Sequence, residues 1–450
     1  YGRDTVDVDL LKKVEIMKGP SSVEYGSDGL AGTIAYFTKD PTDLVNNGKY
    51  LSITTNYIEK NKQEKVNLLA AYDNENTSGL IQLVNRSLEE TKLHKDFSLK
   101  SNPMEGDQQS IFAKLNVNLS NESKLTFIAD LQEWESEWAI NSEKGFIYFP
   151  APRSISSSSG DDEGSRERFS VTLDISNQNN LYDTASLSYY TQETEQSQIT
   201  IQNQVSFFGG MQAAPTPTMR VRDFDFNQSI NGFALEAFKS LGDHQMVYGI
   251  DIEDTETERP RMLTEINLIT GIPTNIVDGE IYPNKTFPDS ETKRKALFFN
   301  DRFNLSDSSV LNVGFRYDDY ELNVSPDILL TNANILNYQI NNTEDSALSF
   351  KLGYLKDLAE DMTVFVQYAE GFKAPDYETS NTVFTNYLYY YTVIPNPNLE
   401  SEESDTIEIG LRGAGEESAW EFVLYQSEVE GFIHPEVVGF NRGLGIYQYQ

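Results

Sequence analysis

The chain contains no cysteine among its 450 residues, which excludes a disulfide framework, a thiolate zinc site and a catalytic cysteine. Long apolar runs are also missing, because no stretch approaches the ~18 consecutive apolar residues of a transmembrane helix. Positive charge is scarce: 35 Lys and Arg face 70 Asp and Glu, giving a formal net charge of −35. Such a chain cannot neutralise a phosphate backbone, so nucleic acid is excluded as a partner.

Motifs for catalysis and metal binding are scarce as well. The chain has no nucleophile motif, and acid–base carboxylate pairs cannot be singled out among so many acidic residues. His94 and His434 fall in segments expected to be external, where a solvated histidine is more common than a metal ligand. The acidic run Asp161–Glu163 lacks the alternating oxygen ligands of a calcium loop and indicates an exposed loop tip. We therefore expect no enzyme, no resident cofactor and no assigned metal ligand.

The chain does have a regular alternation of apolar and polar residues. One example sets Ile111, Ala113, Leu115, Val117 and Leu119 against Phe112, Lys114, Asn116 and Asn118. A period of two is typical of β-strands with one apolar and one polar face. The pattern predicts about fifteen strands, at residues 49–58, 64–73, 78–87, 108–119, 123–134, 167–176, 182–194, 226–239, 243–255, 295–305, 309–321, 345–357, 361–371, 402–413 and 417–430.

The connections between these strands alternate between short turns and long segments. The long ones are expected at residues 88–107, 135–166, 195–225, 256–294, 322–344 and 372–401. Outer-membrane barrels have short periplasmic turns and long extracellular loops. The fold class predicted is therefore all-β, a transmembrane antiparallel barrel. A charge on the lipid face costs about 2–4 kcal/mol near the midplane, so charged strand residues are expected to line the lumen.

Residues 1–45 have a different character. Val14-Glu15-Ile16-Met17-Lys18-Gly19-Pro20 is a short strand that ends in a Gly-Pro breaker, and Tyr25-Gly26 follows shortly after it. The glycines at 26, 29 and 32 do not have the G-x-G-x-x-G spacing of a nucleotide loop. The whole segment resembles the distal half of the plug domain of TonB-dependent outer-membrane receptors, which carry a Val-Glu-x-x-x-Gly-Pro-x-x-x-x-Tyr-Gly core.

This resemblance implies a barrel of the 22-stranded type, occluded by an N-terminal plug. Residues 1–45 would be the C-terminal half of the plug and residues 46–450 the barrel. The first half of the plug is expected before Tyr1, and the closing strands are expected after Gln450. The resemblance further implies the outer membrane of a Gram-negative bacterium, contact with its lipid, and transport driven by TonB with ExbB and ExbD.

The resemblance also implies a lock between plug and barrel. In the family, a basic residue before the plug's Gly-Pro meets barrel glutamates, and the matching positions here are Lys18, Glu402 and Glu408. Lysine replaces the usual arginine and lacks its bidentate geometry. We therefore expect a weaker lock than the family's.

Two boxes around the segment 372–401 bear on the ligand. Phe372, Ala374 and Pro375 open it, and Asn396, Pro397, Asn398 and Leu399 close it. These boxes resemble those that flank the ligand loop of haem and haemoglobin receptors, and weaker versions occur in siderophore receptors. The histidine usual in haem receptors is missing, and the segment contains a cluster of tyrosines instead: Tyr377, Tyr387, Tyr389, Tyr390 and Tyr391. Phenolate ligates haem iron in some proteins, whereas aromatic rings stack on siderophores.

The sequence thus predicts active, TonB-dependent uptake of a scarce ligand, an iron chelate such as a ferric siderophore or haem, free or on a carrier protein. Two other classes remain open. A passive porin needs no plug, so the segment 1–45 argues against it. A secreted all-β enzyme or adhesin has no need of alternating long and short connections.

Overall fold

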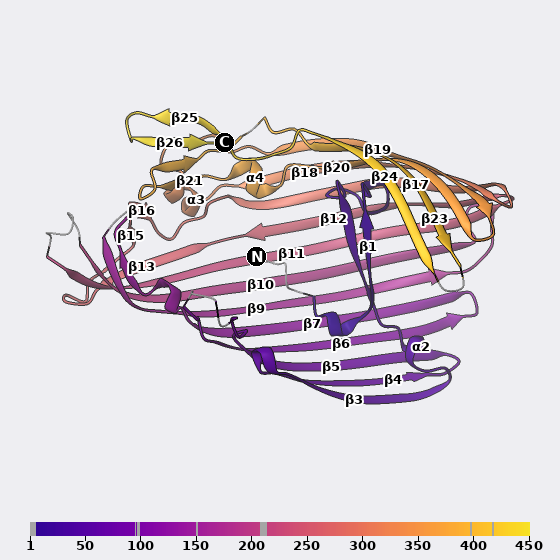
Figure 1. The fold of residues 1–450 in the computed structure, drawn as a ribbon, viewed down its shortest axis with the longest axis horizontal. Coiled ribbons are helices and arrows are strands. Elements are labelled where there is room, and N and C mark those ends of the chain that lie inside the picture. Colours follow the sequence, from indigo (N-terminus) through magenta and orange to yellow (C-terminus); the bar gives the residue numbers. More distant parts are fainter. Residues whose placement is uncertain are drawn as a thin grey trace.

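The computed structural model describes residues 6–94, 96, 100–149, 152–207, 214–396, 398–415 and 418–450. The N-terminal part, residues 6–45, is called the plug segment below. Its β1 (Leu11–Lys18) and β2 (Gly32–Thr38) form an antiparallel hairpin, and Figure 1 shows this hairpin lying across the long strands. The other plug elements are η1 (Val8–Leu10), α1 (Ser22–Tyr25) and α2 (Pro41–Leu44).

The rest of the chain forms a curved antiparallel wall in which each long strand pairs with the next. The fifteen long strands of the described residues match the fifteen predicted, which confirms the strand prediction. They are β3 (Gly48–Ile58), β4 (Gln63–Asp73), β5 (Thr77–Glu89), β6 (Met104–Ser120), β7 (Ser123–Ala139), β9 (Arg153–Ile175), β10 (Thr184–Ser206), β11 (Thr216–Leu241), β12 (His244–Glu258), β17 (Asp289–Ser306), β18 (Ser309–Ser325), β19 (Thr343–Ala359), β20 (Met362–Lys373), β23 (Glu402–Ala414) and β24 (Ala419–Glu430).

The shorter elements gather mainly at the end of the wall opposite the short turns (Figure 1). They are η2 (Glu59–Asn61), η3 (Asn141–Glu143), β8 (Gly145–Ile147), β13 (Arg261–Asn267), β14 (Pro273–Thr274), β15 (Ile276–Val277), β16 (Glu280–Ile281), α3 (Ile328–Ala333), α4 (Tyr377–Asn381), β21 (Phe384–Asn386), β22 (Tyr391–Val393), β25 (Val437–Asn441) and β26 (Ile446–Tyr449). Strands β21, β22, β26 and β25 form a small separate sheet. None of the helices in the described residues is long and apolar enough to cross a membrane.

The wall has an inner and an outer face of opposite character. Leu80 and Phe112 point inward and are buried, at 4% and 0% exposure, against the plug segment's Leu10. Their neighbours Ile81 and Ile111 point outward and are 47% and 43% exposed. A band of outward apolar residues follows the strands around the wall, as contact with lipid requires. Charged strand residues such as Arg316 lie on the inner face, as predicted.

Two predicted long loops, at residues 135–166 and 195–225, were wrong, because much of each is strand in the structure. Strand β9 already begins at Arg153, and β10 and β11 continue to Ser206 and from Thr216. The acidic run at 161–163 therefore lies within β9, paired with Ile199, Gln198 and Ser197 of β10, and is not a loop tip. Beyond the lipid, both faces of a strand meet water, so strands there lose the apolar alternation used to predict them.

Candidate functional site

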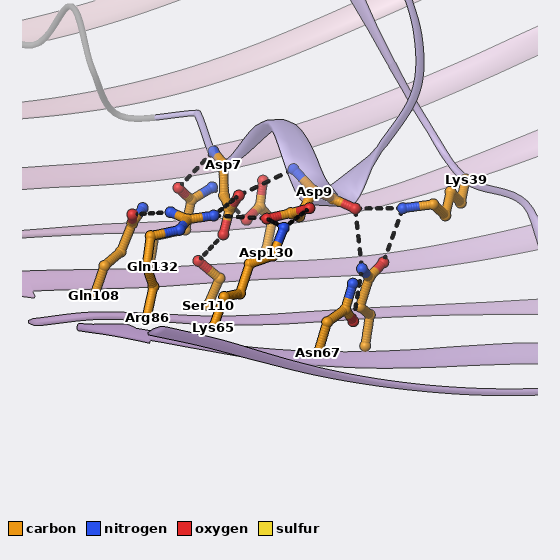
Figure 2. A network of polar contacts seen from close by, with 11 residues as sticks. Asp7, Asp9, Lys39, Lys65, Asn67, Arg86, Gln108, Ser110, Asp130 and Gln132 are labelled. Carbon is orange, nitrogen blue, oxygen red and sulfur yellow. Dashed lines mark hydrogen bonds and ion pairs between the residues drawn. The ribbon is translucent and has the colours of Figure 1, made fainter. Parts of the chain in front are cut away.

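The plug segment contacts the inner face of the wall in two places, and the first is a buried polar network around Asp7 and Asp9 (Figure 2). The Asp7 side chain is fully buried and accepts hydrogen bonds from Ser110 Oγ at 2.8 Å and Arg86 Nη2 at 3.1 Å. The Asp7 backbone N–H donates to Gln132 Oε1 at 3.0 Å. These wall residues come from β5, β6 and β7, so one plug residue joins three strands.

Asp9 connects two wall cations. Its Oδ1 accepts from Lys65 Nζ at 2.8 Å and its Oδ2 accepts from Arg86 Nη2 at 2.6 Å. Burial raises the pKa of Asp9, but the hydrogen bonds from Lys65 and Arg86 outweigh burial and hold the pKa below its usual value. The carboxylate is therefore ionised at neutral pH and holds the plug to β4 and β5.

A further ion pair of the same polarity lies near the short turns. Asp40, which caps α2, pairs with Lys114 of β6 at 2.9 Å. The nearby Asn116 Nδ2 also donates to Asp40, at 3.3 Å. Plug carboxylates thus face wall cations along β4 to β6.

The second plug–wall contact uses mainly backbone and hydroxyl groups. The Phe372 N–H donates to Ser22 Oγ at 3.0 Å, and the Asp28 N–H donates to the Phe372 carbonyl at 3.0 Å. Ser404 Oγ donates to the Leu30 carbonyl at 2.8 Å. The box residues Phe372, Ala374 and Pro375 are buried here; the first two contact the plug, whereas the Pro375 carbonyl accepts from Tyr320 of β18.

The two motif glycines of the plug touch charged wall residues. Gly26 has φ +82°, and a Cβ added there would lie 2.9 Å from Arg316 Nη2. Arg316 is itself held by Asp251 at 2.7 Å and Asp318 at 3.0 Å. Gly19 has φ +85°, and its Cβ would lie 3.0 Å from Glu408 Oε1. Both positions need glycine for the backbone angle and for the close approach of the wall. Of the neighbouring motif residues, Pro20 is buried and Tyr25 is 46% exposed.

The expected lock at Lys18 is not formed in this structure. Lys18 is exposed and makes no ion pair within the described residues, whereas Glu402 pairs with Lys373 at 3.2 Å. Glu408 does reach the plug, but at the backbone of Gly19. The strongest charged contacts run the other way, from plug carboxylates to wall cations. Sequence reasoning missed them because a single sequence does not show which wall cations lie opposite Asp7 and Asp9, 56 to 79 positions away.

The five tyrosines of the segment 372–401, called the tyrosine segment below, do not form one cluster. Tyr377, in α4, packs against Phe287 with ring centroids 5.0 Å apart and the rings tilted by 52°, and Tyr387 covers Gly279. Tyr391, in β22, lies between Phe384 and Tyr449. Tyr389 and Tyr390 stand at the tip of the β21–β22 turn and are 55% and 53% exposed. Of the five, only these two are more than half exposed, and the Tyr389 ring also lies edge-on to Phe149, with ring centroids 6.1 Å apart.

Burial also changes the chemistry of the inner tyrosines. It raises the pKa of Tyr377 to about 12, with the neighbouring Glu378 and Asp376 adding to the effect. Burial likewise raises the pKa of Tyr387. A phenol with a raised pKa gives up its proton to an iron centre less readily. The geometry therefore favours packing for Tyr377 and Tyr387, and the ligand roles of all five tyrosines remain predictions.

The other predicted residues lie around the same end of the wall. Asn396 Oδ1 accepts from the Asn398 N–H at 3.1 Å in a tight turn, Leu399 is half-buried, and Pro397 lies outside the described residues. His94 and His434 are exposed and lie beside Asp96 at 3.5 Å and Glu436 at 2.9 Å. The described residues contain no group of three His, Cys, Asp or Glu side chains that could hold a metal ion.

Two external segments meet at Arg261, which the sequence did not single out. Its guanidinium lies 4.9 Å from the Phe224 ring, 5.7 Å from the Tyr282 ring and 5.3 Å from the Phe384 ring. Phe384 belongs to β21 of the tyrosine segment, whereas Tyr282 follows the β15–β16 hairpin. Arg261 therefore ties the two segments together.

Within the described residues, two further arginines at this end form no ion pair with a carboxylate, although Glu143 and Asp278 lie close enough to act on Arg222. Arg222 of β11 forms no hydrogen bond or ion pair within the described part of the chain, although its neighbour Arg220 pairs with Glu265 and Asp278. Arg153 of β9 has its Nε and Nη1 atoms buried without a hydrogen-bond partner. The chain has twice as many acidic as basic residues. Two arginines without an ion pair at the end of the wall opposite the short turns, called the mouth below, therefore favour an anionic ligand.

Known families match both parts of the chain. The family model described as "TonB dependent receptor-like, beta-barrel" matches residues 112–450. The model described as "TonB-dependent Receptor Plug Domain" matches residues 1–33.

Individual proteins show the same likeness. Hemoglobin-haptoglobin utilization protein B of Neisseria meningitidis is 21% identical over 97% of this chain and 58% of its own length. The solved structure of the FrpB iron transporter of Neisseria meningitidis covers 99% of the chain at a TM-score of 0.68, with 14% identity and 64% of its own length matched. The copper transporter OprC has the same TM-score of 0.68 at 16% identity, with 99% of this chain and 62% of its own matched. The chain thus spans about three fifths of the length of these relatives.

Proposed function

The chain belongs to the family of TonB-dependent receptors, and on this premise we propose that the protein takes up an iron chelate across the outer membrane. The family is one of receptors and transporters, so we assign no catalytic reaction to the chain. The observation that carries the proposal is the plug segment held against the inner face of the wall by Asp7 and Asp9. A docked plug blocks free diffusion, so uptake needs energy to move it.

The ligand proposed is anionic and contains iron, as a ferric siderophore or as haem. Arg153 and Arg222, which form no ion pair within the described residues, supply the positive charge at the outer end of the wall. The exposed Tyr389 and Tyr390 supply aromatic faces for stacking. Several relatives are named for haemoglobin or iron, which supports iron, whereas the copper transporter of similar fold shows that the fold alone does not set the cargo.

The test is growth and iron uptake in a Gram-negative host that lacks its own iron receptors. Cells that express the complete receptor should accumulate labelled iron supplied as haem or as a ferric siderophore, whereas cells with the empty vector should not. Accumulation of copper and not of iron would contradict the proposed cargo. Accumulation of neither would contradict the transport function.

A further inference from the structure

Lys65 and Arg86 are directly opposite each other on neighbouring strands of the wall. The register pairs Lys65 of β4 with Arg86 of β5. Like charges directly opposite in an antiparallel pair repel each other, so this arrangement needs an anion between them. These two residues are called the cation pair below.

The anion between them comes from the plug. The Asp9 carboxylate accepts from Lys65 Nζ with both oxygens, at 2.8 and 2.9 Å, and its Oδ2 also accepts from Arg86 Nη2 at 2.6 Å (Figure 2). A chelate's carboxylate or a haem propionate would be held in the same way, because charge-assisted hydrogen bonds from two cations suit any such oxyanion. Around the cation pair, Gln108 and Ser110 add a further acceptor and donor.

No wall carboxylate competes for these cations. Within the described residues, every ion pair of Lys65, Arg86 and Lys114 is made to a plug residue: Asp9, Asp7 and Asp40. Asp130, a wall carboxylate that belongs to the same network through Gln132, is paired with Arg166 at 3.0 Å. Withdrawal of the plug segment would therefore leave three uncompensated cations on β4, β5 and β6.

We propose that the cation pair Lys65–Arg86 is an anion-binding site on the transport path, occupied at rest by the plug's Asp9 and taken over by the anionic ligand when the plug segment withdraws. This inference rests on the proposed uptake of an anionic chelate. Lys114 lies on the same face nearer the short turns and is released from Asp40 by the same movement. The ligand thus replaces the plug's carboxylates one after the other along the wall.

The first experiment measures the site without any iron ligand. The complete receptor in detergent is melted in chloride and in sulfate at equal ionic strength, as wild type, as Asp9→Asn, and as Asp9→Asn with Lys65→Gln and Arg86→Gln. Sulfate should raise the Tm of Asp9→Asn more than that of the wild type, because the variant leaves Lys65 without a carboxylate and Arg86 with Asp7 alone. The triple variant should lose this extra gain. An equal gain in all three proteins would overturn the site.

The matched control removes a carboxylate from a lone cation. Asp174 of β9 pairs with Lys124 at 3.2 Å, and no second cation lies opposite them. Asp174→Asn should therefore show no extra gain in sulfate. An extra gain there as large as that of Asp9→Asn would mean that sulfate stabilises the receptor without using the cation pair, which would also overturn the site.

A second experiment keeps the proposal testable if the Asp9 variant does not fold. Lys65→Met and Arg86→Gln are compared with the wild type in cells for surface binding and for uptake of labelled ferric siderophore. We expect unchanged binding at the mouth and uptake slower by roughly tenfold or more, the size of effect that a lost buried charge partner produces. Uptake at the wild-type rate in both variants would refute the site. If the wild type itself takes up no iron, the proposed function fails, whereas the sulfate result still decides the anion site.

Discussion

At the scale of single residues, charge holds the plug to the wall. Asp7 is fully buried and Asp9 bridges two cations, so each carboxylate is paired and hydrogen-bonded as a buried charge requires. The polarity is the reverse of the one expected from Lys18. Because both partners are charged, the contact can be weakened by pH and by single substitutions.

The pH dependence of the plug follows from Asp9. Its pKa in the folded protein is lowered by Lys65 and Arg86, against the effect of burial. A carboxyl group whose pKa is lowered by folding stabilises the folded state at pH values above its unfolded pKa of about 4. This stabilisation is lost as the pH falls through the folded pKa. The protection of residues 8–18 against hydrogen exchange, measured relative to the intrinsic exchange rate at each pH, should therefore be constant between about pH 8 and 5 and fall in stronger acid. Asp9→Asn should exchange faster at neutral pH and depend less on acid, and an unchanged acid profile would contradict this account.

Gly26 offers a second test of the plug–wall contact. Gly26→Ala should destabilise the docked plug by about 1–3 kcal/mol, because alanine is strained at this positive φ, and its Cβ would also press on Arg316 at 2.9 Å. Gly242→Ala is the matched control, since Gly242 has φ +61° with nothing within 4 Å. Protease sensitivity of the plug should rise in the first variant only. Equal sensitivity in both would assign no role to the Arg316 contact.

At the scale of elements, some tyrosines of the tyrosine segment pack against neighbouring residues and others are exposed to solvent. Tyr377, Tyr387 and Tyr391 contact other external segments, and the β21–β22 turn exposes Tyr389 and Tyr390. The same turn is tied through Phe384 to Arg261. The segment is therefore held by its packed tyrosines, and its tip exposes the two aromatic side chains that a ligand can reach.

This division predicts different effects at the tip and inside. Replacing Tyr389 and Tyr390 together by Ala should weaken binding of the iron ligand about tenfold, as the loss of two stacking contacts would. Replacing them by Phe should leave binding intact if the rings stack, and should remove the Soret shift if a phenolate ligates haem. Tyr387→Phe is the control inside the segment. Wild-type binding by the Ala variant would place the ligand contacts elsewhere.

Strand β9 gives a prediction of a different kind. Its polar part carries Ser156–Ser159 and the acidic run at 161–163, yet it pairs with β7 and β10 on both sides. Backbone amides of residues 158–165 should therefore exchange slowly in the complete receptor. The exposed turn at residues 177–181 serves as the fast reference. Exchange at 158–165 as fast as in that turn would restore the loop interpretation.

At the scale of the whole molecule, a plug docked by two separate contacts makes transport depend on energy. We expect uptake by the complete receptor to stop in a strain that lacks TonB and to stop when a protonophore collapses the proton gradient. The physical reason is that both the charged contact and the backbone contact must be broken before the lumen opens. Uptake that continues at the wild-type rate without TonB would favour a passive porin.

The sequence by itself determined the strands of the wall and the plug hairpin. Alternation at positions such as Ile111 to Leu119 is a local property, because consecutive strand residues face lipid and plug in turn. The Gly-Pro and Tyr-Gly motif is local as well. Alternation was insufficient in the outer half of β9, because a strand surrounded by water does not need it.

Only the tertiary structure decided which residues meet across the lumen. Asp9 lies in η1, just before the plug hairpin, and meets Lys65 of β4 and Arg86 of β5, which are 56 and 77 positions away in the chain. Lys18 lies on an exposed part of β1 and therefore misses the glutamates assigned to it. The tyrosines show the same distinction: they all lie between positions 377 and 391, yet Tyr377 packs against Phe287 and Tyr387 against Gly279. Charge pairing depends on distances between strands far apart in the chain, and no local pattern in a single sequence records those distances.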